Sequence, residues 1–500
     1  MKWLKRIQNY LFYILIFCIS WQTRWIISSG ELNNGYSEYL TYSLYAIDIL
    51  LIINFIIFFC LNWKNNNQAK KQSCDKLNEA QKNHETRQCC DKLNEAQKNH
   101  ETRQCLVSTG EQRFLFPTIK NLKIKIYWYL LAVFELSIFI SIFRSSDIQL
   151  AFYKYAHFLL GVGIFFLILN IKITSRKIIQ IFILGLAMQA SLGIWQFMTQ
   201  SSFASTYLGI AKQIASQGGV SVIETLAPAE RWLRAYGGLS HPNILGGVLI
   251  LGLLFLVRLI LDKIDEDILP CRDALTGRLY DYDGVFNTKI FYLIICNIFI
   301  LGIFFSFSRA AWLSLIISII FIIFFRNSKF FKKNIFSKNY KLLILNLLFL
   351  FILIFPYYHL VNTRLGGAAR LERQSNIERI NLLEEAKNII HKNLFLGAGA
   401  GNYILALHES DPNRPSYTYS PVHNTLLLIW AELGLLGLVS FIALLVYAFW
   451  WNWQRRQFIN ATIILAMFIL MNFDHWWWSL HFGILFFYLI LGLVLREKNC

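Results

Sequence analysis

Charged residues are scarce in this chain. Asp, Glu, Lys and Arg make up 16% of its 500 residues, hydrophobic residues make up 56%, and the mean hydropathy is +0.44. This composition excludes a soluble globular protein of such length, because a membrane span needs about 20 mostly apolar residues. We therefore predict an all-α integral membrane protein with about twelve transmembrane helices. Their expected ranges are 7–27, 41–62, 124–143, 150–171, 178–199, 244–262, 289–306, 310–326, 341–359, 424–449, 458–473 and 477–495.

Acidic residues are the scarcer charged class: there are 30, against 48 Lys and Arg, for a net charge of +18. The cations gather in alternate loops, at 172–177, 326–341 and 455–456. Cationic loops usually stay in the cytoplasm, so we expect both termini there and no nucleic-acid partner. Lys2, Lys5 and Arg6 precede the first apolar run and leave a signal peptide as an alternative. We discount it because no small-residue cleavage site closes the run.

Cysteines are absent from both long loops predicted to lie outside, which argues against a disulfide framework. Two identical 16-residue copies fill residues 74–105 within a polar segment, and four of the nine cysteines end these copies. We interpret the repeat as a disordered cytoplasmic insertion. Metal binding by the repeat is the alternative, although the spacing matches no usual zinc pattern. Its candidate ligands would be Cys74, His84, Cys89, Cys90, His100 and Cys105.

The predicted spans and loops divide the chain into five parts. These are the first two spans at 1–63, the cytoplasmic loop at 64–123, spans three to nine at 124–359 with an outside loop at 201–243, a large outside loop at 360–423, and the last three spans with a cytoplasmic tail at 424–500. The large loop falls between spans nine and ten. The tryptophans Trp476–Trp478 fall at a span end, where they are expected to anchor a helix at the lipid headgroups or, alternatively, to stack on a sugar.

The outside loops contain arginines that suit a phosphate group, because a guanidinium keeps its charge and binds phosphate with two hydrogen bonds. The outside loop at 201–243 ends in Arg234 and a turn that contains His241, Pro242 and Asn243. Interfacial arginine and an ordinary glycine-rich turn are the alternative interpretation of this stretch. Arg309 lies between two strongly apolar runs, where an arginine usually faces a cavity or a partner.

The large outside loop ends in His423, just before an apolar helix. The positive end of a helix favours neutral imidazole and attracts phosphate, so His423 could accept a proton beside a bound phosphate. Earlier in the loop, an amphipathic helix is expected over about 376–392, and the glycine run 397–401 follows it. The run is not a P-loop, because no strand precedes it and no Lys-Ser/Thr follows it.

The ordered set of these motifs resembles the O-antigen ligase/polymerase family of bacterial membrane glycosyltransferases. The resemblance covers roughly residues 120–495. The motifs that carry it are Arg234–Gly237, His241–Asn243, Ser308–Ala310, Arg379, Gly397–Asn402, His423–Asn424 and Glu432–Gly437. The tandem repeat carries none of them.

This resemblance implies a glycosyltransferase in the bacterial cytoplasmic membrane. It would move a glycan from an undecaprenyl-pyrophosphate carrier to a lipid, glycan or protein hydroxyl at the outer face, with inversion and without a metal or other cofactor. His423 would activate the acceptor, Arg234 and Arg309 would bind the pyrophosphate, and Arg379 would assist. The supporting residues would be His241, Asn243, Gly397, Gly399, Gly401 and Asn424.

Two alternatives remain at this point. A polymerase of the same family would carry the same motifs. A twelve-span secondary transporter would place ionisable groups at mid-membrane, for which Asp48, Glu135 and His157 are candidates. Its two halves would also be related, whereas here one half has a large inside insertion and the other a large outside loop.

Overall fold

The computed structural model describes residues 2–63, 126–225, 230–268, 289–325, 348–367 and 369–496. In these ranges, six helical segments are long and apolar enough to cross a membrane, and five apolar helices of 10–17 residues accompany them. The protein is therefore a mostly helical, multi-pass membrane protein. The number of twelve spans and the place of the large loop between them stay predictions. The tandem repeat at 74–105 lies outside the described residues.

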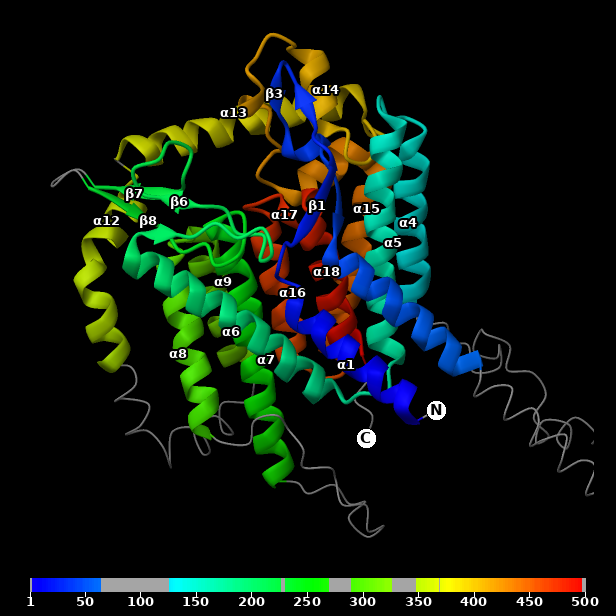
Figure 1. The fold of residues 1–500 in the computed structure, drawn as a ribbon, viewed down its shortest axis with the longest axis vertical. Coiled ribbons are helices and arrows are strands. Elements are labelled where there is room, and N and C mark those ends of the chain that lie inside the picture. The colour runs from blue at the N-terminus through cyan, green and yellow to red at the C-terminus, as the bar shows by residue number, and fades with distance from the viewer. Residues whose placement is uncertain are drawn as a thin grey trace, which may run out of the picture. The chain divides into compact units, whose positions relative to one another are not determined.

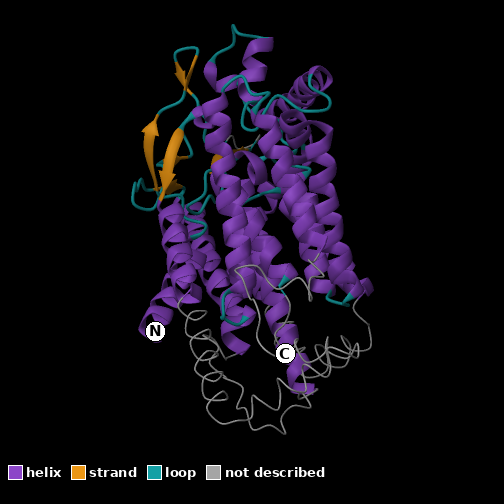
Figure 2. Cartoon of the chain, turned by 90° about the vertical axis from the view of Figure 1, so that its right-hand side faces the viewer, coloured by secondary structure: helices purple, strands orange, loops and turns teal. Residues whose placement is uncertain are grey.

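The chain divides into two compact units. One comprises Met1–Leu11 and Ile52–Tyr129, and the other comprises Phe12–Leu51 and Leu130–Cys500. The second unit contains every predicted site residue. Figure 1 shows its helices, and Figure 2 shows that its strands lie toward one end of them.

Most of the α-helices overlap the predicted apolar stretches, and several more lie within the loops. The first span is shorter than predicted, because its helix ends at Cys18 and not at residue 27. The α-helices are α1 (Lys2–Cys18), the helix Ala46–Trp63, α4 (Ile126–Ile142), α5 (Ile148–Asn170), α6 (Ser175–Thr199), α7 (Pro242–Ile268), α8 (Lys289–Phe305), α9 (Arg309–Phe325), α12 (Tyr358–Gly366), α13 (Arg370–Lys392), α14 (Tyr403–Ser410), α15 (Thr425–Gln454), α16 (Phe458–Met471), α17 (Trp476–Ser479) and α18 (His481–Leu495).

Short antiparallel hairpins correct the prediction of an all-α chain. They pair β1 (Arg24–Ser28) with β4 (Tyr42–Tyr45), β2 (Glu31–Leu32) with β3 (Gly35–Tyr36), β5 (Ser201–Ser202) with β6 (Gln213–Ile214), and β7 (Val222–Glu224) with β8 (Arg231–Leu233). All of them lie in segments that join helices. Apolar periodicity does not reveal strands of two to five residues, because so few positions show no alternation.

The core of the second unit surrounds α18, in which every residue is buried. A helix that is apolar on all sides belongs inside a bundle, and α18 packs there against α5. The interpretation of Trp476–Trp478 as an interfacial anchor is wrong, because all three are at most 4% exposed. Their rings stack within the core, Trp476 on Trp477 at 4.1 Å and Trp478 beside Phe158 at 4.4 Å.

The apolar stretch between 291 and 325 is two helices, with a break at residues 306–308. Phe307 has a positive φ of 46°, which ends α8 and redirects the chain. The Ser308 carbonyl and hydroxyl accept hydrogen bonds from Trp312 and Ala311, so Ser308 caps α9. The break leaves the carbonyls of Ser306 and Phe307 outside both helices.

The predicted large loop at 360–423 is largely helical, because α13, α14 and most of α12 fall within it. The amphipathic helix begins at Arg370, six residues earlier than its apolar pattern indicated. The earlier turn contains Arg370, Glu372 and Arg373, and polar residues hide a helix from a search for apolar periodicity. In Figure 1, α12 and α13 lie near the hairpin of β7 and β8.

Candidate functional site

A polar pocket of about 220 Å³ lies among the β7–β8 hairpin, the start of α7, α12, α13 and the loop before α15. It brings together five residues that the sequence predicted, although they are far apart along the chain: Arg234, His241, Asn243, Arg379 and His423. Ser221, Arg364, Glu372, Ser375 and Glu378 add further polar groups to its wall.

Arg234 is fixed by the break between α8 and α9. Its Nε donates to the Ser306 carbonyl at 2.8 Å, and one terminal nitrogen donates to the Phe307 carbonyl at 3.3 Å and to Asn243 Oδ1 at 2.7 Å. Burial and the neighbouring Arg364 lower the pKa of Arg234 well below its usual value. No carboxylate of the described residues forms an ion pair with it, so its positive charge is available to an anion.

Arg364 and Arg309 share one acid, Glu372, which is only 3% exposed. Arg364 forms a close ion pair with this carboxylate, and its Nε donates to the Phe307 carbonyl at 3.0 Å. Arg309 approaches the other oxygen of Glu372 at 3.7 Å and donates to Asn376 at 3.2 Å. Arg309 therefore lies beside the pocket and does not line it, and one acid balances part of the charge of two arginines.

Arg379 lines the pocket from α13 and differs from the other arginines. Among the residues that the structure describes, none gives its guanidinium a hydrogen bond or an ion pair. A guanidinium without protein partners can offer a full bidentate face to a phosphate. Arg379 is therefore the cation in this pocket with the most hydrogen-bonding capacity left for a ligand.

His241 is a neutral, orienting residue. Its Nδ1 accepts a hydrogen bond from the Asn243 backbone at 3.1 Å, and its Nε2 is 2.9 Å from the Ser221 hydroxyl. Burial and the positive charge of Arg234 lower the pKa of His241 to about 3. A neutral ring that accepts at Nδ1 carries its proton on Nε2, so it has no free nitrogen to act as a base.

The carboxylate of Asp474 lies beside the His423 ring. The Nδ1 of His423 is 3.5 Å from Asp474 Oδ1, and the His423 side chain is 29% exposed at the pocket. Burial alone would raise the pKa of Asp474, but His423 and the nearby His475 and His241 hold that pKa well below its usual range. The ionised carboxylate favours a proton on Nδ1, which leaves Nε2 as the proton acceptor.

Asn243 connects this acid to the arginines. Its side-chain oxygen accepts from Arg234, and its amide nitrogen donates to Asp474 Oδ2 at 3.3 Å. Arg234, Asn243, Asp474 and His423 thus form one chain of polar contacts. Asn424, which follows His423, lies outside the pocket lining and caps α15 by accepting from the Leu427 backbone at 3.0 Å.

The predicted glycine run lies elsewhere. Gly397, Gly399 and Gly401 have φ values of 69°, 102° and 72°, a conformation that favours glycine. The run packs on α15, where Gly399 donates to the Glu432 carbonyl at 2.8 Å and Gly401 donates to the Glu432 carboxylate at 2.7 Å. α15 itself is kinked at Gly434. The structure therefore gives these glycines a packing role away from the arginines.

Two groups of described residues bring possible metal-ligating atoms within 4.8 Å of one another. They are His423 with Asp474 and His475, and Asp48 with His157 and His481. In the first group, Asp474 Oδ1 accepts from the His475 backbone at 2.8 Å, and His475 Nδ1 is 2.6 Å from the Ser479 hydroxyl. These contacts suit an orienting acid and its base better than a metal.

Residues 294–442 match the family model described as O-antigen ligase. This segment is an O-antigen ligase domain. The match covers 149 of the 500 residues, and over this segment it supports the predicted resemblance to the O-antigen ligase family. The matched segment includes Arg309, Arg379 and His423, whereas Arg234 and Asp474 lie outside it on either side. No curated protein matches the chain.

Three groups beside the O-antigen ligase motifs were not predicted as site residues: Arg364, Glu372 and Asp474. Arg364 and Glu372 fall in a segment crowded with charges, where no single residue stands out. Asp474 carries a clearer signal, because it is the only acidic residue in the short stretch 472–480 between two apolar helices.

Proposed function

We propose that the protein transfers a glycan from an undecaprenyl-pyrophosphate carrier to an acceptor hydroxyl, at the outer face of the bacterial cytoplasmic membrane. The observation that carries this proposal is the pocket itself, which places uncompensated arginines and a solvent-accessible histidine in one polar space. A pyrophosphate needs the cations, and a hydroxyl nucleophile needs the base. The loops 201–243 and 360–423 face outward in this proposal, and both termini are cytoplasmic.

The reaction follows from these groups. The acceptor hydroxyl loses its proton to His423 Nε2 while its oxygen attacks the anomeric carbon of the donor. The bond between that carbon and the pyrophosphate oxygen breaks, and the pyrophosphate leaves with its electron pair. Attack opposite the leaving group inverts the anomeric carbon. Arg234 and Arg379 stabilise the charge that develops on the pyrophosphate, and Arg309 assists from beside the pocket.

The direct test is transfer by the purified, full-length protein in lipid nanodiscs. A lipid-pyrophosphate glycan serves as the donor, and the glycosylated product is measured with different acceptors. Transfer to a lipid acceptor would identify a ligase, whereas lengthening of a second lipid-linked glycan would identify a polymerase. A protein that binds the donor but transfers nothing to any acceptor would contradict the proposal.

Arg379→Ala should weaken donor binding by roughly 10- to 100-fold, because charge-assisted hydrogen bonds contribute about 1.5–3 kcal/mol. The affinity for the lipid-pyrophosphate donor is the measurement. The protein's melting temperature should hardly change, since Arg379 has no partner among the described side chains. Arg370→Ala is the matched control, because Arg370 lies on the same helix, is exposed and pairs with Glu224. Equal donor affinities for the two variants would show that Arg379 does not bind the donor.

Transfer should continue at its full rate in excess EDTA. Arginines neutralise the leaving pyrophosphate here, and they leave no task for a divalent cation in the reaction. The measurement is the initial rate before and after EDTA is added. Loss of activity that Mg²⁺ or Mn²⁺ restores would show that the transfer uses a metal.

A further inference from the structure

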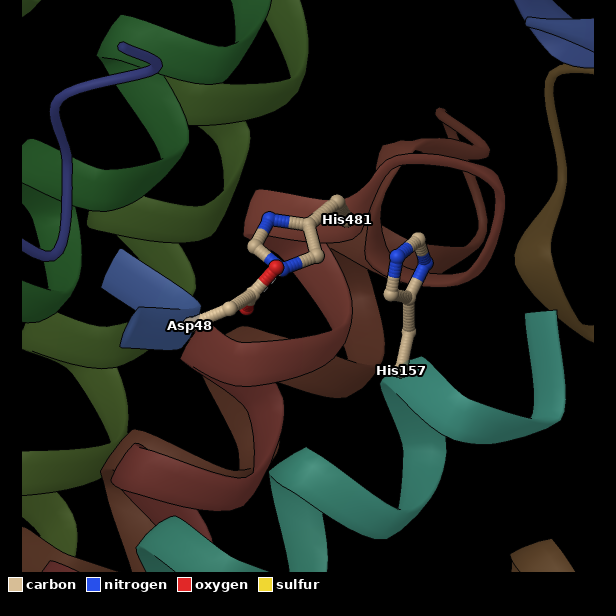
Figure 3. Close-up of side chains that lie close together, drawn as sticks. All are labelled: Asp48, His157 and His481. Atoms are coloured by element: carbon tan, nitrogen blue, oxygen red, sulfur yellow. Dashed lines mark hydrogen bonds and ion pairs between the residues drawn. The ribbon is translucent and has the colours of Figure 1, made fainter. Parts of the chain in front are cut away.

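The second group of potential ligands lies outside the pocket and serves no step of the proposed transfer. Asp48 lies in the first turn of the helix Ala46–Trp63, His157 lies on α5, and His481 opens α18. All three are buried, with exposures of 3%, 4% and 5%. Figure 3 shows that they project from three separate segments toward one another.

Part of this cluster is a hydrogen-bonded pair of Asp48 and His481. His481 Nε2 lies 2.7 Å from Asp48 Oδ1, and Asp48 Oδ2 accepts from the Tyr45 backbone at 3.3 Å. The Tyr45 ring also stacks on His481, with 3.8 Å between the centroids. An aspartate and a histidine in such contact need no further partner to be stable.

His157 is the member that this pair does not explain. Its ring centroid is 4.6 Å from that of His481, and the rings of Tyr45 and Tyr153 also surround it. Within the described ranges, its buried Nδ1 has no hydrogen-bond partner. A buried polar atom without a partner costs about 1–3 kcal/mol, which a bound ligand would recover.

We propose that Asp48, His157 and His481 form a structural site for a zinc-type divalent metal ion. Two imidazoles and one carboxylate suit zinc and neighbouring transition metals, and they disfavour Mg²⁺ and Ca²⁺. The three ligand atoms lie within 4.8 Å of one another. Tetrahedral ligands at about 2.1 Å from zinc are about 3.4 Å apart, so small side-chain movements would bring these three atoms to three of the four ligand positions.

A metal at this position would join three segments that are distant in sequence. It would tie the start of the helix Ala46–Trp63 to α5 and to the central helix α18. Lys154, one turn before His157 on α5, is the nearest cation on that helix, and its ammonium lies 3.5 Å from the Ser479 carbonyl. The carboxylate of Asp48 supplies the negative charge that offsets part of the charge of a divalent ion.

The test measures bound metal directly and does not depend on transfer activity. Full-length protein in detergent is loaded with Zn²⁺, passed through a desalting column and analysed for zinc per chain. A parallel sample loaded with Co²⁺ is examined for the visible absorption of tetrahedral cobalt. We expect about one ion per chain and a cobalt spectrum.

Two variants and two controls assign the ion. Asp48→Asn is nearly isosteric, and His157→Gln keeps a polar side chain, so each should fold and lower zinc affinity by about tenfold or more. His391→Ala, an exposed histidine on α13, should retain the ion. His475→Gln tests the cluster beside His423. The proposal would be overturned by any of three results: the wild type binds no zinc, both Asp48→Asn and His157→Gln retain it, or only His475→Gln loses it.

Discussion

His423→Ala is expected to lower the rate of glycan transfer by about 10²–10⁴, the usual cost of losing a positioned general base. Donor binding should be nearly unchanged, because the arginines of the pocket do not depend on the imidazole for their contacts. The measurements are the single-turnover rate and the donor affinity of the purified variant. Near-normal turnover would show that His423 is not the base.

The matched control for this variant is His391→Ala, because His391 is exposed on α13 and does not line the pocket. Asp474→Asn is a useful companion. It keeps the shape of the side chain and removes the charge that favours a proton on Nδ1, so we expect a slower reaction with unchanged donor affinity. A fall in donor affinity of the same size as the fall in rate would instead indicate that Asp474 supports Arg234 through Asn243.

Arg234→Lys and Arg309→Lys are both expected to impair transfer severely and to weaken donor binding by about tenfold or more, because an ammonium cannot reproduce the guanidinium fork. Arg234 holds Ser306, Phe307 and Asn243 at once, and a lysine at this position would release most of those contacts. Arg309→Lys could keep its ion pair with Glu372 but would lose the geometry that also reaches Asn376. Donor affinity by titration is the measurement.

Arg231→Lys is the appropriate control, since Arg231 begins β8 three residues before Arg234, is exposed, and donates from its side chain to the Gln217 carbonyl. The melting temperatures of all three variants show whether weaker donor binding comes from lost contacts with the donor or from a destabilised loop. Donor affinities equal to that of the Arg231→Lys control would show that Arg234 and Arg309 have a packing role and do not bind the donor.

Much of the architecture could be predicted, because membrane spans are specified by long apolar runs that are evident in the sequence. The strands could not, since hairpins such as β7–β8 contain only three residues on each side. The start of α13 differs from its prediction for a related reason. Its first turn contains the charged residues Arg370, Glu372 and Arg373 with only one apolar residue, Leu371, so the apolar pattern does not extend back to it.

For the site, the sequence indicated Arg234 and His423 from their places at the ends of the long outside loops, and Arg379 from the family resemblance. It could not reveal their partners. Whether Asp474 lies behind His423 depends on how two loops about 50 residues apart meet, and no local pattern encodes that. Positive φ values favour glycine at 397, 399 and 401, where the run packs against α15, and a role of these glycines in ligand binding stays a prediction.

The polar chain from Arg234 through Asn243 and Asp474 to His423 has a consequence for protein engineering. The segment 294–442 that matches the family contributes His423, the proposed base, but Asp474 beside it and the Asn243 amide that joins Asp474 to Arg234 come from parts of the chain on either side. Grafting this segment alone into a relative would replace the histidine without its carboxylate. A functional chimera must therefore exchange the region from the β7–β8 hairpin through α17 as one cassette.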